Sequence, residues 1–272
     1  METVEARRIH EETTVMNRIH QTDCVEGMKQ MAPGSIDVII TSPPYNIGMC
    51  YDAYDDNMPF DEYLSWMEEI GRLFARVLKP SGSLFFNIGD KPSDTFRSFK
   101  VAEQISKHLK LQNTIHWIKS IASPEHGVNV GHYKPVNSER FLNNTHEYLF
   151  HFTKEADVPL DKLSIGVPYR DKTNTKRWNG SHVRDRGNVW LVPYETVQDA
   201  KDHPAAFPKQ LPMMCLKLHG YDEDTIVLDP FCGTGTTCIA ARELGCKWLG
   251  YEIDPTYAAR ATEKLSIGML FT

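Results

Sequence analysis

The sequence predicts an α/β fold, with a doubly wound, mostly parallel sheet. Short apolar runs alternate with longer segments whose apolar residues recur at helical spacing, and this alternation indicates parallel strands joined by helices. The length of 272 residues suits one large domain with an insertion. Hydrophobic residues make up 41% of the chain and charged residues 24%, which predicts an ordinary globular core.

The first half of the chain, residues 15–152, carries most of the expected strands. Residues 1–14 are charged and lack the apolar stretch of a signal peptide, so we expect a flexible tail there. Proline and glycine bound the short apolar run Ile36–Ile40 on both sides, which is typical of a buried parallel strand. The other expected elements are strands at Val15–His20, Ser83–Ile88, Thr114–Lys119 and Glu147–Phe152, and helices at Asp23–Met31, Leu64–Leu78 and Phe96–Leu109.

Residues 153–202 interrupt this rhythm. Scattered prolines, glycines and polar residues replace the periodic apolar faces, which indicates an inserted subdomain. Regular alternation returns in residues 203–272, which we expect to complete the same domain. The elements expected there are helices at Phe207–His219, Thr236–Leu244 and Pro255–Leu265, and strands at Thr225–Asp229 and Trp248–Ile253.

A glycine turn near the C-terminal end has the pattern of a cofactor site. The strand Thr225–Asp229 leads directly into Pro230–Gly235, and a helix follows. Glycines in such a turn let the backbone pass close to a ligand, and the helix N-terminus offers amide donors. Glu252 ends the next strand, 17 residues after Gly235, where an acidic residue commonly accepts hydrogen bonds from ribose. The third glycine of a dinucleotide fingerprint is missing, so a single nucleoside fits better; a purely structural turn is the alternative.

Ser42-Pro43-Pro44-Tyr45 follows the strand Ile36–Ile40 at its carboxyl end, where open α/β sheets place their sites. The prolines stiffen the turn, so the Pro43 carbonyl and Ser42 Oγ can serve as two fixed acceptors. Two acceptors match the two hydrogens of an exocyclic NH2 group on a base, and Tyr45 can stack on that base. Such a site favours methyl transfer by alignment, on a base flipped out of its duplex. The alternative is a rigid loop with Tyr45 as a packing residue.

The two motifs together resemble those of the DNA amino-methyltransferases, which use S-adenosylmethionine (SAM) to methylate adenine N6 or cytosine N4. The catalytic motif (D/N/S)-P-P-(Y/F/W) is matched by Ser42–Tyr45, and the SAM motif DPFxGxGTT by Asp229–Thr237. A catalytic motif that precedes the SAM motif is the order of the β group. The resemblance implies a circularly permuted, seven-stranded Rossmann-like sheet, SAM as cofactor and double-stranded DNA as substrate.

The resemblance also implies roles for individual residues. Ser42, Pro43, Pro44 and Tyr45 form the expected catalytic set. Asp23 and Cys24 match the position that contacts the SAM adenine, and residues 203–208 look like the segment beside SAM. The expected cofactor-binding residues are Asp23, Cys24, Ser42, His203, Ala205, Phe207, Asp229, Pro230, Phe231, Gly233, Gly235, Thr236, Thr237 and Glu252. We interpret His116-Trp117 and His146-Glu147 as sheet and packing residues, outside the catalytic set, although the resemblance places a family block there, near the flipped base.

The motif variants favour cytosine N4 as the methylated atom. Within the family, serine at the first catalytic position accompanies cytosine N4 enzymes, and aspartate accompanies adenine enzymes. Phe207 stands where adenine enzymes often carry lysine, which favours cytosine too. Tyr45-Asn46 is common among adenine enzymes, so adenine N6 stays open. The family order disfavours protein-glutamine methylation, and the absence of a Pro-Cys dipeptide excludes the cytosine-C5 mechanism.

The insertion contains a basic segment, although the whole chain has a net charge of −6. Arginines and lysines with interleaved Trp178 and His182 are the footprint expected for phosphate and base contacts, and the family places target recognition in this region. A solvated loop with incidental charge is the alternative. The expected DNA-binding residues are Arg170, Lys172, Lys176, Arg177, Trp178, His182, Arg184 and Arg186.

Cysteine spacing and the length of apolar runs argue against metal-binding, disulfide-bonded and membrane-spanning proteins. The six cysteines show no CxxC spacing, so we expect neither zinc nor disulfides. No apolar run approaches the roughly 20 residues of a membrane span, and we expect a cytoplasmic, nucleoid-associated protein. The resemblance leaves two partners open, a second copy of the chain and a cognate restriction endonuclease. It also leaves a non-catalytic SAM- or DNA-binding regulator and an RNA-directed enzyme as alternative functions.

Overall fold

A central eight-stranded sheet organises the computed structural model, which describes residues 16–49, 56–133, 135–169, 182–193 and 207–267. The expected tail, residues 1–14, lies outside these ranges. The strand order is β1-β12-β11-β2-β3-β7-β4-β10, and only β7 runs antiparallel to its neighbours. The strands are β1 (Arg18–Gln21), β2 (Ile36–Thr41), β3 (Leu78–Ile88), β4 (Lys110–Ile118), β7 (His146–Thr153), β10 (Val189–Leu191), β11 (Ile226–Asp229) and β12 (Lys247–Glu252).

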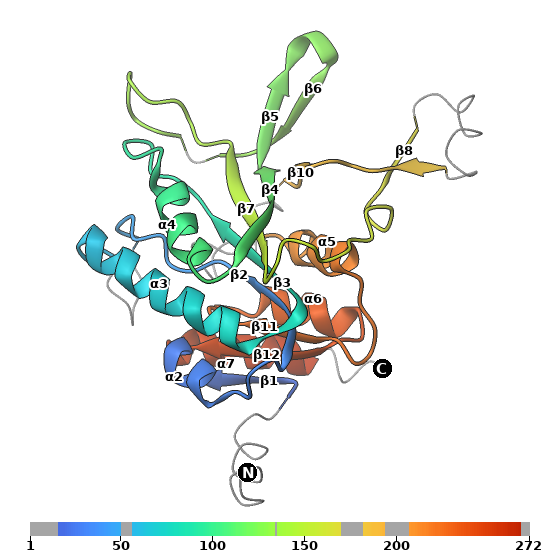
Figure 1. Cartoon of the computed structure of the whole chain (residues 1–272). Helices are drawn as coiled ribbons and strands as arrows, with labels where there is room; N and C mark the ends of the chain where they lie inside the picture. The colour runs from blue at the N-terminus through green and yellow to red at the C-terminus, as the bar shows by residue number, and fades with distance from the viewer. Residues whose placement is uncertain (1–15, 50–55, 134, 170–181, 194–206, 268–272) are drawn as a thin grey trace, which may run out of the picture.

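Helices cover both faces of this sheet, which confirms the doubly wound class (Figure 1). One face packs against α2 (Cys24–Gln30), α3 (Phe60–Val77) and α4 (Arg97–Ser106). The other packs against α5 (Gln210–His219), α6 (Thr236–Glu243) and α7 (Pro255–Ile267). Strand β2 contributes to the hydrophobic cores on both faces of the sheet. Ile39 packs in the core beneath α2, α3 and α4, whereas Val38 and Ile40 pack in the core beneath α5, α6 and α7.

The sheet has one strand more than the seven expected. The additional strand, β10, comes from the expected insertion and pairs in parallel with β4, Trp190 lying opposite Trp117. Both indoles are 1% exposed, and Trp117 Nε1 donates to the Val192 carbonyl at 2.8 Å. A strand of three residues leaves no periodic pattern in the sequence, so packing of the two tryptophans, not local propensity, accounts for it.

Two small antiparallel pairs complete the described strands. Strands β5 (Ser120–Ser123) and β6 (Val128–Gly131) form a hairpin around the short 3-10 helix η1 (Pro124–His126), and the hairpin extends away from the body (Figure 1). Strands β8 (Val167–Pro168) and β9 (Val183–Arg184) pair within the expected insertion. Within the described ranges, no helix is long and apolar enough to cross a membrane, and no group of His, Cys, Asp or Glu side chains is placed to hold a metal ion.

The four neighbouring strands β1, β12, β11 and β2 run in the same direction, so their carboxyl ends meet at one edge. Ser42 follows the end of β2, and Pro230 follows the end of β11. The sheet therefore brings the two sequence motifs together, although almost 190 residues separate them in the chain. Ligands of open α/β sheets bind at this edge.

Candidate active site

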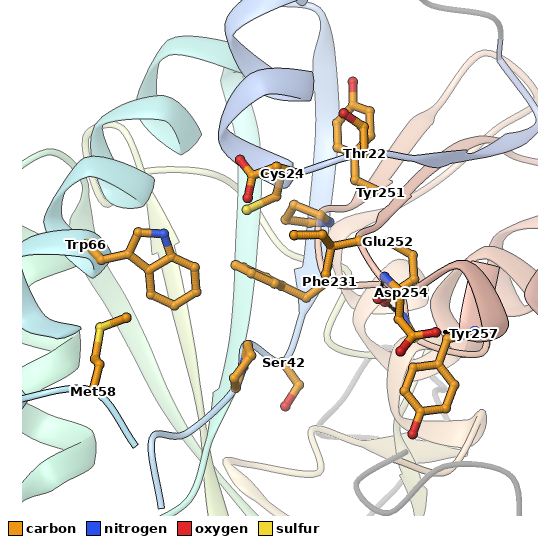
Figure 2. A pocket seen from close by; sticks show the side chains of 15 residues that line it. Thr22, Cys24, Ser42, Met58, Trp66, Phe231, Tyr251, Glu252, Asp254 and Tyr257 are labelled. Atoms are coloured by element: carbon orange, nitrogen blue, oxygen red, sulfur yellow. Dashed lines mark hydrogen bonds between the residues drawn. The ribbon is translucent and has the colours of Figure 1, made fainter. Parts of the chain in front are cut away.

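A cavity of about 190 Å³ opens beyond the carboxyl ends of these strands (Figure 2). Eight of the predicted site residues line it, from both ends of the chain. Seven further residues were not predicted, and they come from α3, the end of β12, the start of α7 and nearby loops. The lining consists of Thr22, Asp23, Cys24, Ser42, Pro44, Met58, Trp66, Pro230, Phe231, Gly233, Tyr251, Glu252, Ile253, Asp254 and Tyr257.

The glycine turn has the backbone that its sequence requires. Gly233 and Gly235 have φ values of 50° and 85°, in the left-handed region that favours glycine. A Cβ atom on Gly235 would lie 3.1 Å from Ala261 Cβ, so α7 packs closely against this turn. Gly235 itself does not line the cavity, whereas Gly233 does.

Glu252 links the turn to the next strand. One of its carboxylate oxygens accepts from the Gly233 amide at 2.8 Å, and the other accepts from the Asp254 amide at 2.9 Å. Burial raises the pKa of Glu252 above its usual value, although the two backbone bonds oppose this shift. A carboxylate oxygen has more than one lone pair, so Glu252 can still accept a hydrogen bond from a ligand in the cavity.

Aromatic side chains form one wall of the cavity. Trp66 of α3 and Phe231 of the glycine turn meet edge to face, with ring centroids 5.7 Å apart. Figure 2 shows Trp66 and Met58 on one side of the space and Asp254 and Tyr257 on the other, with Phe231 between them. This arrangement offers an apolar slot for a planar ring near an acidic group that accepts hydrogen bonds.

Several residues predicted to bind the cofactor do not line the cavity. The buried Asp229 accepts from the Thr41 hydroxyl at 2.7 Å and from the Phe231 amide at 3.1 Å. The Thr237 hydroxyl donates to the Ile40 carbonyl, so both side chains join the glycine turn to β2 instead of facing the cavity. Phe207 is buried in the core, and Thr236 begins α6. His203 and Ala205 lie outside the described residues.

Besides its two prolines, contacts from α3 and α4 hold the Ser42–Tyr45 loop. The Tyr63 hydroxyl, from α3, donates to the Pro44 carbonyl at 2.7 Å. Asn46 has a φ of 54°, a conformation that asparagine tolerates better than most residues. Arg97 Nη1 donates to the Asn46 carbonyl at 3.0 Å from α4.

Asp56 holds the continuation of this loop from the inside. Its carboxylate is 2% exposed and accepts from the amides of Asn46, Ile47 and Met49 at 2.7, 3.1 and 2.9 Å. Backbone donors that converge on one carboxylate fix the local path of the chain. The sequence gives no sign of this contact, because Asp56 belongs to no motif.

A polar cluster surrounds the Tyr45 hydroxyl, and two of its members come from β3 and β7. The hydroxyl lies 2.9 Å from Ser42 Oγ, donates to Glu147 Oε2 at 2.9 Å, and accepts from Asn87 Nδ2 at 2.7 Å. Lys119 Nζ contacts the other Glu147 oxygen at 2.8 Å. Glu147 lies in the sheet, as interpreted from the sequence, and its carboxylate also bonds to the predicted catalytic tyrosine, a contact that the sequence analysis did not foresee.

The basic segment of the insertion is described only in part. Arg170, Lys172, Lys176, Arg177 and Trp178 lie outside the described residues. His182 and Arg184 are exposed. Arg186 is half-buried, and its Nε donates to the Ile165 carbonyl at 2.9 Å, so it has a structural contact.

Residues 36–263 match a protein-family model for N6- and N4-directed methyltransferases, described as "DNA methylase". The chain belongs to this DNA methylase family. The family assignment confirms the resemblance of the two motifs. It covers both motifs, the Tyr45 cluster and the cavity lining except Thr22, Asp23 and Cys24, which precede the matched residues.

Similar proteins span both base specificities of the family. Type II methyltransferase M.BglII of Bacillus subtilis is 29% identical, over 92% of this chain and 69% of its own length. DNA adenine methyltransferase YhdJ of Escherichia coli (strain K12) is 27% identical, over 90% and 81%. Among solved structures, the cytosine-N4-specific PvuII DNA methyltransferase superposes with a TM-score of 0.67 and 19% identity, over 92% of this chain and 89% of that one. TTHA0409 of Thermus thermophilus, in complex with S-adenosyl-L-methionine, has a TM-score of 0.63 and 24% identity, over 94% and 95%. These two likenesses bear on the fold alone.

Proposed function

We propose that this DNA methylase transfers a methyl group from SAM to the N4 amine of a cytosine flipped out of double-stranded DNA. The observation that carries the proposal is the position of Ser42, which lines the same cavity as Glu252 and Phe231. An acceptor for an amine thus lies at the edge of a cavity suited to a nucleoside. Base flipping follows from this placement, because a base stacked in a duplex cannot reach such a recess.

The cavity residues fit SAM in chemical character. Glu252 can accept hydrogen bonds from ribose hydroxyls, and the wall formed by Trp66 and Phe231 offers an apolar surface against which an adenine ring can pack. Gly233 lets the backbone pass close to the ligand. Bound there, SAM would supply an activated methyl group on a sulfonium. The solved TTHA0409 complex supports the same cofactor for this fold.

Ser42 Oγ and the Pro43 carbonyl would hold the amine by accepting its two hydrogens. This favours a tetrahedral nitrogen whose lone pair is less delocalised into the ring. Tyr45 would stack on the base while its hydroxyl stays in the polar cluster. Because the donor methyl is already activated, the contribution of these residues is alignment and exclusion of water.

Cytosine N4 is favoured over adenine N6 by Ser42 and by Phe207, and the cytosine-N4-specific PvuII enzyme has the same fold. The second candidate is adenine N6, which Tyr45-Asn46 and the adenine-specific relative YhdJ favour. The basic insertion, residues 153–202, would recognise the DNA sequence around the target. A companion restriction endonuclease is proposed because M.BglII is a Type II methyltransferase, and a homodimer is proposed from the family resemblance.

The proposal is tested by incubating the protein with labelled SAM and mixed-sequence duplex DNA, followed by nucleoside mass spectrometry. We expect N4-methylcytosine. N6-methyladenine alone would overturn the choice of base, and no transfer despite tight SAM binding would favour a regulator. Ser42→Ala should keep SAM affinity and lose most turnover. Ser65→Ala is the matched control, because Ser65 is exposed on α3 and bonds only locally to the Asp61 carbonyl.

A further inference from the structure

We propose that Glu147 is a positioning residue that orients the Ser42 hydroxyl through Tyr45. This inference rests on the proposed function, because it concerns how Ser42 comes to accept a hydrogen from the target amine. Glu147 lies in β7, 102 positions from Tyr45, and the carboxylate meets the tyrosine hydroxyl at 2.9 Å. The carboxylate is not a catalytic residue in this scheme, since it does not touch the base.

The positions of the hydrogens follow from which groups can donate. A carboxylate only accepts, so the single Tyr45 hydrogen points to Glu147 Oε2. Asn87 must present its Nδ2 to this corner, because it lies 2.8 Å from the same carboxylate oxygen and 2.7 Å from the tyrosine oxygen. The contact of 2.9 Å between Ser42 and Tyr45 also needs one hydrogen, and only Ser42 can supply it.

The Ser42 hydrogen therefore points toward Tyr45, away from the position of a target amine. Asn87 Nδ2 donates to Ser42 Oγ in a long contact of 3.5 Å. A hydroxyl oxygen has two lone pairs, so one of them remains to accept an N–H from the base. Without this series of hydrogen bonds from Glu147 through Tyr45, the serine hydroxyl could rotate and present its own hydrogen to the amine. Two donors would then face each other, and the nitrogen would not be held for attack.

Lys119 fixes the Glu147 carboxylate, from which this series of hydrogen bonds starts. Its ammonium lies 2.8 Å from Glu147 Oε1, and the two side chains are 13% and 11% exposed. A charge-assisted bond in such a shielded place holds both groups in one geometry. Lys119 occupies one oxygen and Tyr45 with Asn87 the other, so each oxygen of Glu147 has a separate role.

Glu147→Gln should reverse the direction of the hydrogen bonds from residue 147 through Tyr45 to Ser42, while it conserves the shape of the side chain. The Lys119 ammonium only donates, so it selects the carbonyl oxygen of the new amide. The amide nitrogen must then face Tyr45 and donate to its oxygen. The new amide nitrogen also meets Asn87 Nδ2, which donates to the wild-type carboxylate at 2.8 Å, so the Asn87 amide must turn away. Tyr45 can no longer donate to residue 147, and its hydrogen is released to turn to Ser42 Oγ and occupy a lone pair that the amine needs.

Four variants test this reversal by single-turnover methylation at saturating SAM and DNA. Glu147→Gln should lower the rate on the order of 10²-fold, as the loss of a preorganised hydrogen bond at a reacting centre does, with SAM affinity unchanged by calorimetry. Tyr45→Phe keeps the stacking ring, and we expect a milder loss. The double variant should recover to the rate of Tyr45→Phe, because no hydroxyl remains to be reversed. Glu243→Gln is the matched control, an exposed carboxylate paired with Lys209.

The outcomes separate this inference from the proposed function. No methyl transfer by the wild-type protein would overturn the proposed function itself. An active wild type with a fully active Glu147→Gln would overturn only the role of Glu147. A double variant slower than both single variants would also overturn it, because independent structural damage adds whereas relief of a reversed bond does not.

Discussion

The Thr41 hydroxyl donates a 2.7 Å hydrogen bond to the Asp229 carboxylate, 188 positions away in the sequence. Both side chains are almost fully buried, and they lie at the ends of the neighbouring strands β2 and β11. Thr41 directly precedes the Ser42–Tyr45 loop, and Asp229 directly precedes the glycine turn. This bond therefore couples the placement of the amine loop to the placement of the cofactor turn.

Thr41→Val removes the hydroxyl and conserves the shape of the side chain. Asp229 then loses a donor in a buried place, so we expect the free energy of unfolding to fall by about 1–3 kcal/mol. Urea denaturation followed by circular dichroism measures this. Thr41→Ser keeps the donor and serves as the control. Equal stability of Thr41→Val and the wild type would mean that the bond contributes nothing net.

Asp229 also predicts a pH dependence of stability. Burial raises its pKa from 3.8 to about 6 in the folded protein, although the hydrogen bonds from Thr41 and the Phe231 amide oppose the shift. A raised folded pKa contributes stability that is fully present below the unfolded pKa. That contribution is lost as the pH rises through about 4 to 6, and it amounts to roughly 3 kcal/mol.

The variant Asp229→Asn cannot ionise and isolates this effect. We expect its stability relative to the wild type to increase steadily as the pH rises through that window, and to stay constant above it. Urea midpoints measured across the pH range provide the comparison. A difference between the two proteins that does not change with pH would show that Asp229 titrates at the same pH in the folded and unfolded chains.

The sequence predicted the sheet edge because apolar periodicity and turn residues are local properties. Ile36–Ile40 and Thr225–Asp229 are short apolar runs that end in distinct turns, and both became neighbouring strands. Strand β10 was missed because its three residues are held by the packing of Trp190 against a distant part of the chain. Local pattern carries no information on such a contact.

The site was predicted where motif residues face the cavity, and missed where distant residues enter it. Trp66 lies on α3 beside the apolar positions of the core, and its spacing alone does not distinguish a cavity wall from packing. Glu147 is the second residue of a mostly buried strand, and a charged residue there was the available signal for a polar partner. Its link to Tyr45 depends on the antiparallel placement of β7 between β3 and β4, which periodicity does not specify.

Trp66 should report the binding of SAM. Its indole lines the cavity and meets Phe231 at 5.7 Å, so an adenine beside it should change the tryptophan fluorescence. Trp66→Phe should abolish most of that change, and Trp248→Phe, a buried core variant, should keep it. Trp66→Ala should weaken SAM binding roughly 3- to 10-fold, the scale of a lost aromatic pair. An unchanged response in Trp66→Phe would place the adenine elsewhere.

We expect Arg184 to contact DNA and Arg186 to stabilise the fold. Arg184 is exposed on β9, whereas Arg186 is half-buried and donates to the Ile165 carbonyl. Arg184→Ala should weaken DNA binding similarly for all sequences and reduce the slope of log affinity against log salt by about 1. Arg186→Ala should instead lower the free energy of unfolding by about 1 kcal/mol, because a charged donor to a carbonyl is lost. Fluorescence anisotropy with labelled duplex at several salt concentrations measures the first effect, and thermal denaturation the second.

If Arg184→Ala leaves the salt slope unchanged, the DNA path does not cross β9, and the phosphate contacts must come from other parts of the chain.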